Sequence, residues 1–283
     1  MLRKNNYHLK ILRLSRKILF IIFFSFILCI PHLCYATKKK TISCKAVIFS
    51  DSTKIKRLYG KNVHKKILPA STTKIMTALI AMQQLPLNKY VTVNKNATRV
   101  VPTKIFLRPG EEYKVRDLIY AILIMSANDA SVVLAEAVAG SEKNFVKMMN
   151  KKAKQIGARH TKFANSHGLP TPKNTQYTTA YDMYLIFREA LKYPFFRKAI
   201  TYKYKNIYSK NGRKITLKSH NKILFKNWKK KIYGKTGYTK AAGACFIGTL
   251  KKGKSSLIIG AFGCPKRWKD IKYIVSTYGG IRL

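Results

Sequence analysis

The hydrophobic pattern alternates near both ends of the chain, which predicts β-strands there. Near the start, the segments 45–51 and 54–61 read as two short strands around the turn at 51–53. From residue 202 onward the period is two again, and Asn211-Gly212 is typical of a tight hairpin. The strands expected in this later region are 202–209, 213–219, 231–239, 244–252 and 255–263.

Apolar residues at helical spacing fill the middle of the chain. The first such segment is apolar on most sides and ends at Pro86, which indicates a helix buried among other helices. Gly140 suits a left-handed helix end, and Ser141 suits the cap of the next helix. A later helix begins at Thr179 and is closed by Pro194. The expected helices are 71–85, 116–125, 130–140, 141–157, 179–192 and, at the end of the chain, 266–278.

Strands at both ends with helices between them are typical of an α+β fold. We expect one antiparallel sheet built from the two ends of the chain, covered by helices, with an all-helical subdomain inserted. At 283 residues, the 47% hydrophobic content is ample for the core of such a domain.

The first 36 residues are typical of a secretory signal. Six basic residues and no acidic residue accompany the apolar run 18–30, which is followed by the small-residue exit Cys34-Tyr35-Ala36. The run of 13 residues is short for a bilayer span. We therefore expect 1–36 to be a cleaved signal peptide and 37–283 to be a domain exported to the periplasm or cell envelope. Retention of an uncleaved N-terminal anchor is the alternative.

The exported part would carry 51 basic and 10 acidic residues, a net charge of +41. Such a surface attracts anions, and an exported protein meets anionic wall polymers and lipid head groups. The sequence has no Cys/His zinc spacing, RNP-like motif or basic zipper, so we expect no nucleic-acid partner. A general lysine bias of the source proteome is the alternative explanation of the charge.

Three cysteines lie in the exported part: Cys44, Cys245 and Cys264. An odd number allows at most one internal disulfide and leaves a spare thiol, and the absence of C-x-x-C argues against redox or metal chemistry. We expect each of these cysteines to be a buried free thiol, and we expect neither a metal nor a cofactor.

Ser71-Thr72-Thr73-Lys74 places a hydroxyl and an amine three positions apart at the start of a buried helix. The free N–H groups and dipole of a helix N-terminus favour negative charge on the serine oxygen, and the lysine lies on the same face. Lysine is a base only if burial and a second cation lower its pKa toward neutrality. A helix cap beside a solvated lysine is the alternative. The same spacing at Ser219 and Lys222 ends a strand, whose alternation sends the side chains to opposite faces.

Two further motifs carry polar groups at buried positions. Ser126-Ala127-Asn128 lies between two apolar helices, where buried polar groups need partners, so it suits a proton relay and a contact to a substrate amide. A helix junction capped by Ser or Asn is the alternative. Lys235-Thr236-Gly237 lies in an expected strand, where glycine permits close approach and the other two residues suit a carboxylate. An edge strand protected by lysine is the alternative. The order of all three motifs gives them more weight than each has alone.

In this order, the three motifs resemble those of the penicillin-interacting serine enzymes. The longer blocks resemble the D-alanyl-D-alanine carboxypeptidases, the low-molecular-mass penicillin-binding proteins: PASTTKIMTAL, LRPGEEYKVRDLIYAILIMSANDA, FANSHGL, YTTAYDM and YGKTGYTKAAG. The resemblance extends over about residues 41–280. It implies a β-lactamase/transpeptidase-like fold with a five-stranded antiparallel sheet.

The resemblance also implies catalytic roles. Ser71 would attack the peptide carbonyl of a D-Ala-D-Ala terminus to form an acyl-enzyme, and Lys74 would take the hydroxyl proton. Ser126 would relay a proton toward the leaving D-alanine. Asn128 would hold the substrate amide.

The strand motif would bind the substrate. Lys235 and Thr236 would hold the terminal carboxylate beside Gly237, and the N–H groups of Ser71 and Tyr238 would form the oxyanion hole. The implied partners are peptidoglycan stem peptides ending in D-Ala-D-Ala, and β-lactams as covalent inhibitors.

The expected function is therefore a serine-type D-Ala-D-Ala carboxypeptidase. A D,D-endopeptidase of peptidoglycan crosslinks is the runner-up, because it differs only in the leaving amine. A β-lactamase is disfavoured because the sequence lacks Glu-x-x-x-Asn, the loop pattern with which class A β-lactamases deacylate. A non-catalytic binder of muropeptides or wall polymers is also disfavoured, because every motif residue is present. Many family members add a C-terminal β domain and anchor, which we do not expect after STYGGIRL.

Three other polar residues are assigned to structure. His167 is expected to shape a loop, and Asp182 to cap a helix or pair with a cation. Arg267 is expected to be a surface cation, with carboxylate binding as its alternative role.

Overall fold

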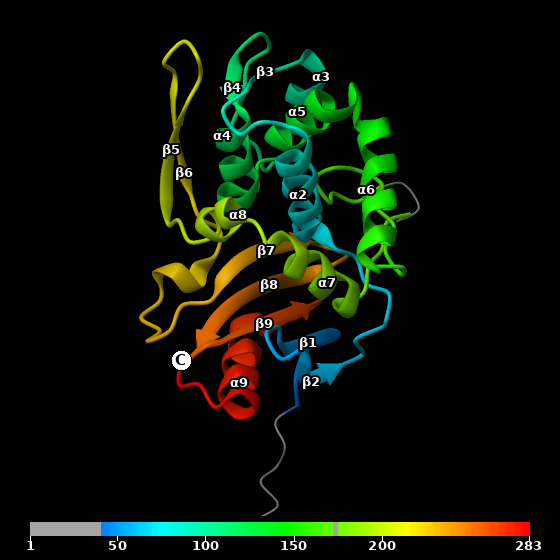
Figure 1. The fold of residues 1–283 in the computed structure, drawn as a ribbon, viewed down its shortest axis with the longest axis vertical. Helices are drawn as coiled ribbons and strands as arrows, with labels where there is room; N and C mark the ends of the chain where they lie inside the picture. The colour runs from blue at the N-terminus through cyan, green and yellow to red at the C-terminus, as the bar shows by residue number, and fades with distance from the viewer. Residues whose placement is uncertain (1–40, 172–174) are drawn as a thin grey trace, which may run out of the picture. The chain divides into compact units, whose positions relative to one another are not determined.

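The computed structural model describes residues 41–171 and 175–283, and the expected signal peptide at 1–36 lies outside them. A five-stranded antiparallel sheet with the order β2-β1-β9-β8-β7 forms the centre of this part (Figure 1). Two of its strands come from the start of the chain and three from the end, which confirms the expected sheet. The strands are β1 (Ala46–Asp51), β2 (Lys56–Lys61), β7 (Tyr233–Thr239), β8 (Gly243–Lys252) and β9 (Ser255–Phe262).

Alternation along the central strands divides the core into two layers. On β1, Ala46 and Ile48 belong to the cluster shared with the helical subdomain, whereas Val47 and Phe49 belong to a cluster that includes α9 (Arg267–Gly279). Figure 1 shows α9 on one side of the sheet and α2, α7 and α8 on the opposite side. Both faces of the sheet are therefore buried, which makes its strands a firm support for side chains at their ends.

The inserted subdomain is built around α2, which packs against α5 and α7. α7 in turn covers β1 and β9 of the sheet. In chain order, the elements between β2 and β7 are η1 (Ala70–Thr73), α2 (Lys74–Gln84), β3 (Tyr90–Thr92), α3 (Lys95–Thr98), β4 (Glu112–Lys114), α4 (Val115–Tyr120), η2 (Ala121–Met125), α5 (Asn128–Ala139), α6 (Glu142–Ile156), α7 (Ala180–Ala190), α8 (Pro194–Ala199), β5 (Tyr204–Tyr208), β6 (Lys214–Lys218) and η4 (Lys222–Phe225).

Two expected helices change pitch within their length. The helix expected at 71–85 begins with the 3₁₀ turn η1, because the N–H and hydroxyl of Thr72 both bond to the Pro69 carbonyl, at 3.2 and 2.6 Å. The helix expected at 116–125 continues from α4 into η2, a π-helical turn. Pro194 follows α7 as expected, but it also occupies the first turn of α8. Proline is tolerated there because an N–H in the first turn has no acceptor within the helix.

The predicted caps are confirmed. The Ser141 hydroxyl accepts a hydrogen bond from Asn144 N at 3.2 Å, and the Thr179 hydroxyl accepts one from Asp182 N at 3.0 Å. Gly140 ends α5 with a φ of 71°. The predicted hairpin is also present, as β5 paired with β6.

The expectation of three free cysteines is wrong for two of them. Cys44 and Cys264 form a disulfide, and Cys245 is the free, buried thiol. The pairing follows from strand register: Ala46 lies opposite Phe262 in the antiparallel β1–β9 pair, so residues two positions further out also meet. The disulfide joins the two ends of the domain.

Candidate active site

Three segments far apart in the sequence meet beside the sheet: η1 with the start of α2, the break between η2 and α5, and β7. Gly237 allows β7 to contact η1. A Cβ at this position would lie 3.0 Å from Ser71 N and 3.1 Å from the Ala70 Cβ, so a side chain would push the strand away. The structure therefore brings together the three motifs that stand out in the sequence.

Lys74 is fully buried, and its Nζ has three oxygen neighbours. It lies 3.2 Å from Ser71 Oγ, 2.7 Å from Asn128 Oδ1 and 2.7 Å from the His167 carbonyl oxygen. Burial, and then the charge of Lys235, hold the pKa of Lys74 well below its usual 10.5. These surroundings favour the neutral amine, the form that acts as a base.

Ser126 and Lys235 form the second pair of the site. Ser126 ends η2 in the left-handed conformation, with a φ of 67° and a ψ of 30°. Its Oγ accepts a hydrogen bond from Lys235 Nζ at 2.9 Å, and the same amine donates to the Thr236 carbonyl at 2.8 Å. Burial, and then the charge of Arg267, lower the pKa of Lys235 to about 7. Lys235 is therefore present in both its protonated and its neutral form near neutral pH.

Asn128 and its neighbour Asp129 hold the loop that precedes β4. Asn128 Nδ2 donates to the Val101 carbonyl at 2.9 Å, while its Oδ1 faces the buried lysine. Asp129 accepts the N–H groups of Ile105 and Leu107 at 3.0 and 3.2 Å. Sequence reasoning missed this role of Asp129, although a carboxylate directly after a buried helix break was a usable signal.

The end of β7 lies at the rim of the site. Thr236 is buried, whereas the Tyr238 side chain is 70% exposed. Arg267 Nη1 donates to the Cys245 carbonyl at 2.7 Å and to the Gly237 carbonyl at 3.4 Å, and burial lowers its pKa to about 10. The expectation that Arg267 is a surface cation is therefore wrong, because the docking of α9 places it against the strand motif.

The loop around His167 contributes through its main chain. The imidazole Nδ1 accepts the N–H of Leu169 at 3.2 Å, and burial lowers its pKa to about 3, so the ring stays neutral and shapes the loop as expected. The carbonyl that faces Lys74 is the functional group that sequence reasoning missed. The next residue, Gly168, is the feature of the sequence that could have indicated this close approach of the main chain. Its φ is 84°, and a Cβ there would lie 1.9 Å from the Ala70 carbonyl oxygen.

Two remaining candidates are structural, although the carboxylate of Asp182 bonds to a neighbouring loop rather than capping a helix or pairing with a cation as expected. Asp182 accepts the Thr161 hydroxyl at 2.8 Å and the His160 N–H at 2.7 Å. The Ser219 hydroxyl accepts the N–H of Asn221, and the side chain of Lys222 is exposed. Ser219 and Lys222 therefore do not form a buried pair.

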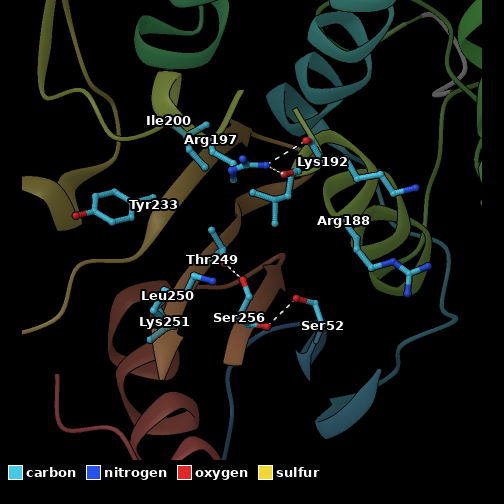
Figure 2. Close-up of a pocket in the computed structure, with 11 residues that line it drawn as sticks. Ser52, Arg188, Lys192, Arg197, Ile200, Tyr233, Thr249, Leu250, Lys251 and Ser256 are labelled. Carbon is cyan, nitrogen blue, oxygen red and sulfur yellow. Dashed lines mark hydrogen bonds between the residues drawn. The ribbon is translucent and has the colours of Figure 1, made fainter. Parts of the chain in front are cut away.

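A cavity of about 530 Å³ lies between α7, α8 and the strands β7 to β9 (Figure 2). Several of its polar groups are bonded within the protein: Ser52 donates to the Ser256 carbonyl, and Arg197 donates to the carbonyls of Leu191 and Lys192. No lining residue belongs to the three motifs. This cavity is therefore separate from the candidate active site.

Known proteins share both the sequence and the fold. The family model of peptidase S11, D-alanyl-D-alanine carboxypeptidase, matches residues 34–265. DacF of Bacillus subtilis is 37% identical over 238 residues, which cover 80% of this chain and 59% of DacF. DacB2 of Mycobacterium tuberculosis is 33% identical over 202 residues, which cover 71% of this chain and 68% of DacB2.

Solved structures agree with this assignment. The crystal structure of a D-alanyl-D-alanine carboxypeptidase from Mycobacterium tuberculosis H37Rv matches with a TM-score of 0.79 and 29% identity, covering 85% of this chain and 92% of that one. A mutant of the Streptomyces K15 DD-transpeptidase matches with a TM-score of 0.77 and 26% identity, covering 86% of this chain and 100% of that one. The expected fold is thereby confirmed, except that the inserted subdomain is not all-helical, because β3 pairs with β4 within it.

The match to DacF spans little more than half of that relative, which limits what transfers from the whole protein. The family match nevertheless covers most of this chain, including all three motifs that the fold brings together. This chain belongs to the D-alanyl-D-alanine carboxypeptidase family of serine peptidases.

Proposed function

We propose that this protein is a serine-type D,D-carboxypeptidase that removes the terminal D-alanine from peptidoglycan stem peptides ending in D-Ala-D-Ala. Relatives with 37% and 33% identity carry the name D-alanyl-D-alanine carboxypeptidase, which supports this substrate class. A D,D-endopeptidase would use the same acylation and release a crosslinked amine in place of free D-alanine.

The contacts of Lys74 carry the proposal. A neutral amine has two N–H donors and one lone pair. Asn128 Oδ1 and the His167 carbonyl, each 2.7 Å from Nζ, accept only and therefore take the two N–H groups. The lone pair is left for the hydroxyl of Ser71, whose Oγ is 3.2 Å away. We therefore propose that Lys74 takes the proton as Ser71 Oγ attacks the carbonyl carbon of the penultimate D-alanine.

Departure of D-alanine requires a proton on its nitrogen. We assign this transfer to Ser126, which gives its hydroxyl proton to the leaving nitrogen and takes one from Lys235, 2.9 Å away. The C–N bond breaks, and the peptide remains as an ester on Ser71. Water then attacks this ester and gives a proton through Ser126 to the neutral Lys235. The proton held by Lys74 goes to Ser71 Oγ as the ester bond breaks, which releases the shortened peptide as a carboxylic acid and restores the serine hydroxyl.

The remaining motif residues hold the substrate. Protonated Lys235 has a third N–H beyond its two protein contacts, which suits the terminal carboxylate together with the Thr236 hydroxyl. The second N–H on Asn128 Nδ2 suits the substrate amide. Main-chain N–H groups of Ser71 and Tyr238 serve as the oxyanion hole.

The same chemistry makes β-lactams covalent inhibitors, since their strained amide would acylate Ser71. We further propose that 1–36 directs export and that the net charge of +41 on 37–283 holds the enzyme to anionic envelope polymers. Within 41–171 and 175–283, no helix is long and apolar enough to cross a bilayer. High salt should release the enzyme from isolated walls, and binding unaffected by salt would contradict retention by charge.

The decisive assay incubates the protein with a stem pentapeptide and, separately, with a crosslinked dimer, followed by mass analysis. Loss of one D-alanine from the pentapeptide supports the carboxypeptidase, and cleavage of the dimer assigns the endopeptidase instead. Ser71→Ala should abolish product, whereas Ser219→Ala, which alters the other Ser-x-x-Lys, should retain wild-type turnover. Product from neither substrate would refute both activities.

A further inference from the structure

A cavity of about 670 Å³ lies between α4, α8 and the β5–β6 hairpin, which stand together in Figure 1. None of its lining residues belongs to the three motifs of the candidate active site. We call it the tyrosine groove and define it by Tyr90, Asp117, Phe195, Tyr202, Lys205 and Tyr208.

The groove presents aromatic rings to solvent. Tyr90 is 37% exposed and Tyr208 is 49% exposed, although both are large side chains. Lys114 Nζ and Lys210 Nζ lie 5.4 and 5.6 Å from the centroid of the Tyr90 ring, so a ligand that stacks on this ring also meets cations.

Beneath these two tyrosines, the ring of Tyr120 packs against Phe195 and Tyr202 with centroid distances of 4.9 and 5.5 Å. Tyrosine rings in a concave site offer flat apolar faces with polar edges. Such faces suit a ligand that combines a flat C–H surface with hydroxyl groups.

Asp117 and the cations give the groove its charge. The carboxylate of Asp117 has no hydrogen-bond donor among the described residues, and its burial raises its pKa. Lys205 Nζ lies 5.3 and 5.2 Å from the rings of Tyr120 and Tyr202. Cations outnumber the single carboxylate in the lining, where they are Lys114, Arg116, Lys198 and Lys205. A complementary ligand therefore carries both donors for Asp117 and a net negative charge.

We propose that the tyrosine groove binds an acidic glycan. Its sugar rings stack on Tyr90 and Tyr208, their hydroxyls donate to Asp117, and its carboxylates pair with Lys205 and the neighbouring cations. A polyanion without sugar rings would leave the aromatic faces unused, and a neutral sugar would leave the cations unused. The choice of the peptide-free hexosamine backbone of peptidoglycan, whose lactyl carboxylates are free, rests on the proposed function, whereas the acidic-sugar chemistry rests on the groove alone.

The test uses Ser71→Ala protein, so that binding is measured without covalent chemistry. The probe is peptide-free glycan of alternating N-acetylglucosamine and N-acetylmuramic acid, titrated calorimetrically beside neutral N-acetylglucosamine oligomers and inorganic polyphosphate. Tyr90→Ala and Tyr208→Ala should each weaken the acidic glycan roughly three- to tenfold. Tyr181→Ala is the matched control, because Tyr181 is also 37% exposed but lies on α7, outside the groove.

The outcomes separate the alternatives. Acidic glycan bound more tightly than the neutral oligomer, with losses in Tyr90→Ala and Tyr208→Ala only, supports the proposal. Equal binding by all variants, or binding of polyphosphate alone, overturns it. If Tyr90→Ala fails to fold, Asp117→Asn provides the same comparison. Release of D-alanine from a free pentapeptide, which has no sugar, should be unchanged in Tyr90→Ala. The glycan-binding proposal and the proposed peptidase activity can therefore be refuted independently of each other.

Discussion

Gly168 holds the loop that supplies the His167 carbonyl against the turn that carries Ser71. Its φ is 84°, and a Cβ there would lie 1.9 Å from the Ala70 carbonyl oxygen, 2.5 Å from the Ala70 carbonyl carbon and 2.8 Å from Thr73 Oγ1. Real Cβ atoms essentially never approach other atoms closer than 3.0 Å, so Gly168→Ala must move main chain rather than a flexible side chain.

The expected cost has two parts. A left-handed alanine costs about 1–2 kcal/mol, and overpacking a tight contact adds about 1–3 kcal/mol. The free energy of unfolding should therefore fall by about 2–5 kcal/mol, against the 5–15 kcal/mol of a typical domain, so a domain of average stability still folds. Relief of the clash displaces Ser71 or the carbonyl that orients Lys74, and a displacement near 1 Å costs about a hundredfold in rate.

Chemical denaturation and the rate of acylation by a fluorescent penicillin measure these two effects. Gly110→Ala is the matched control, because φ is 82° there and nothing lies within 4 Å of the added Cβ. It should lose only the conformational part of the stability and keep the wild-type acylation rate. If Gly168→Ala matched Gly110→Ala in both measurements, the close packing of the loop against η1 would play no part in catalysis.

Three further predictions concern charge and covalent structure. Burial lowers the pKa of Lys235 from 10.5 to about 7, so the unfolded chain binds more protons between these values and stability rises with pH there. Lys74 contributes a rise of the same sign, so denaturation of Lys235→Met should show a smaller rise than the wild type, and an identical pH dependence would contradict the burial of Lys235. Because Lys235 lowers the pKa of Lys74, Lys235→Gln should shift the acidic limb of the acylation rate to higher pH, whereas an unshifted limb would show that the amines are not coupled. Replacing Cys44 and Cys264 by serine should lower the free energy of unfolding by about 2–5 kcal/mol, since the disulfide closes a loop of 220 residues, and unchanged stability would refute its contribution.

Local patterns in the sequence were sufficient for the strands of the central sheet, the β5–β6 hairpin, the longer helices and the three motifs, but not for the short elements β3, α3, β4, α8 and η4. Period-two alternation marks β1 and β9 whatever their partners are, and a cap such as Ser141 acts within one helical turn. The Ser71 and Lys74 pair could be separated from Ser219 and Lys222 because only the former lies in a buried helix. Pitch changes such as η1 and η2 escaped notice, because the apolar spacing is similar in each helix type.

Features that depend on how distant elements dock could not be read from the sequence. The Cys44–Cys264 pair depends on the register between β1 and β9, and the position of Arg267 depends on how α9 packs on the sheet. The His167 carbonyl carries no residue-type signal, since every residue has one. Only the assembled fold shows that this main-chain group faces Lys74.

The most direct test of the central claim is a peptide map of the protein after reaction with benzylpenicillin. The account predicts one covalent adduct on the peptide that contains Ser71, with no adduct in Ser71→Ala and an adduct in Ser219→Ala. An adduct on another residue, or an adduct that persists in Ser71→Ala, would contradict the assignment of the nucleophile.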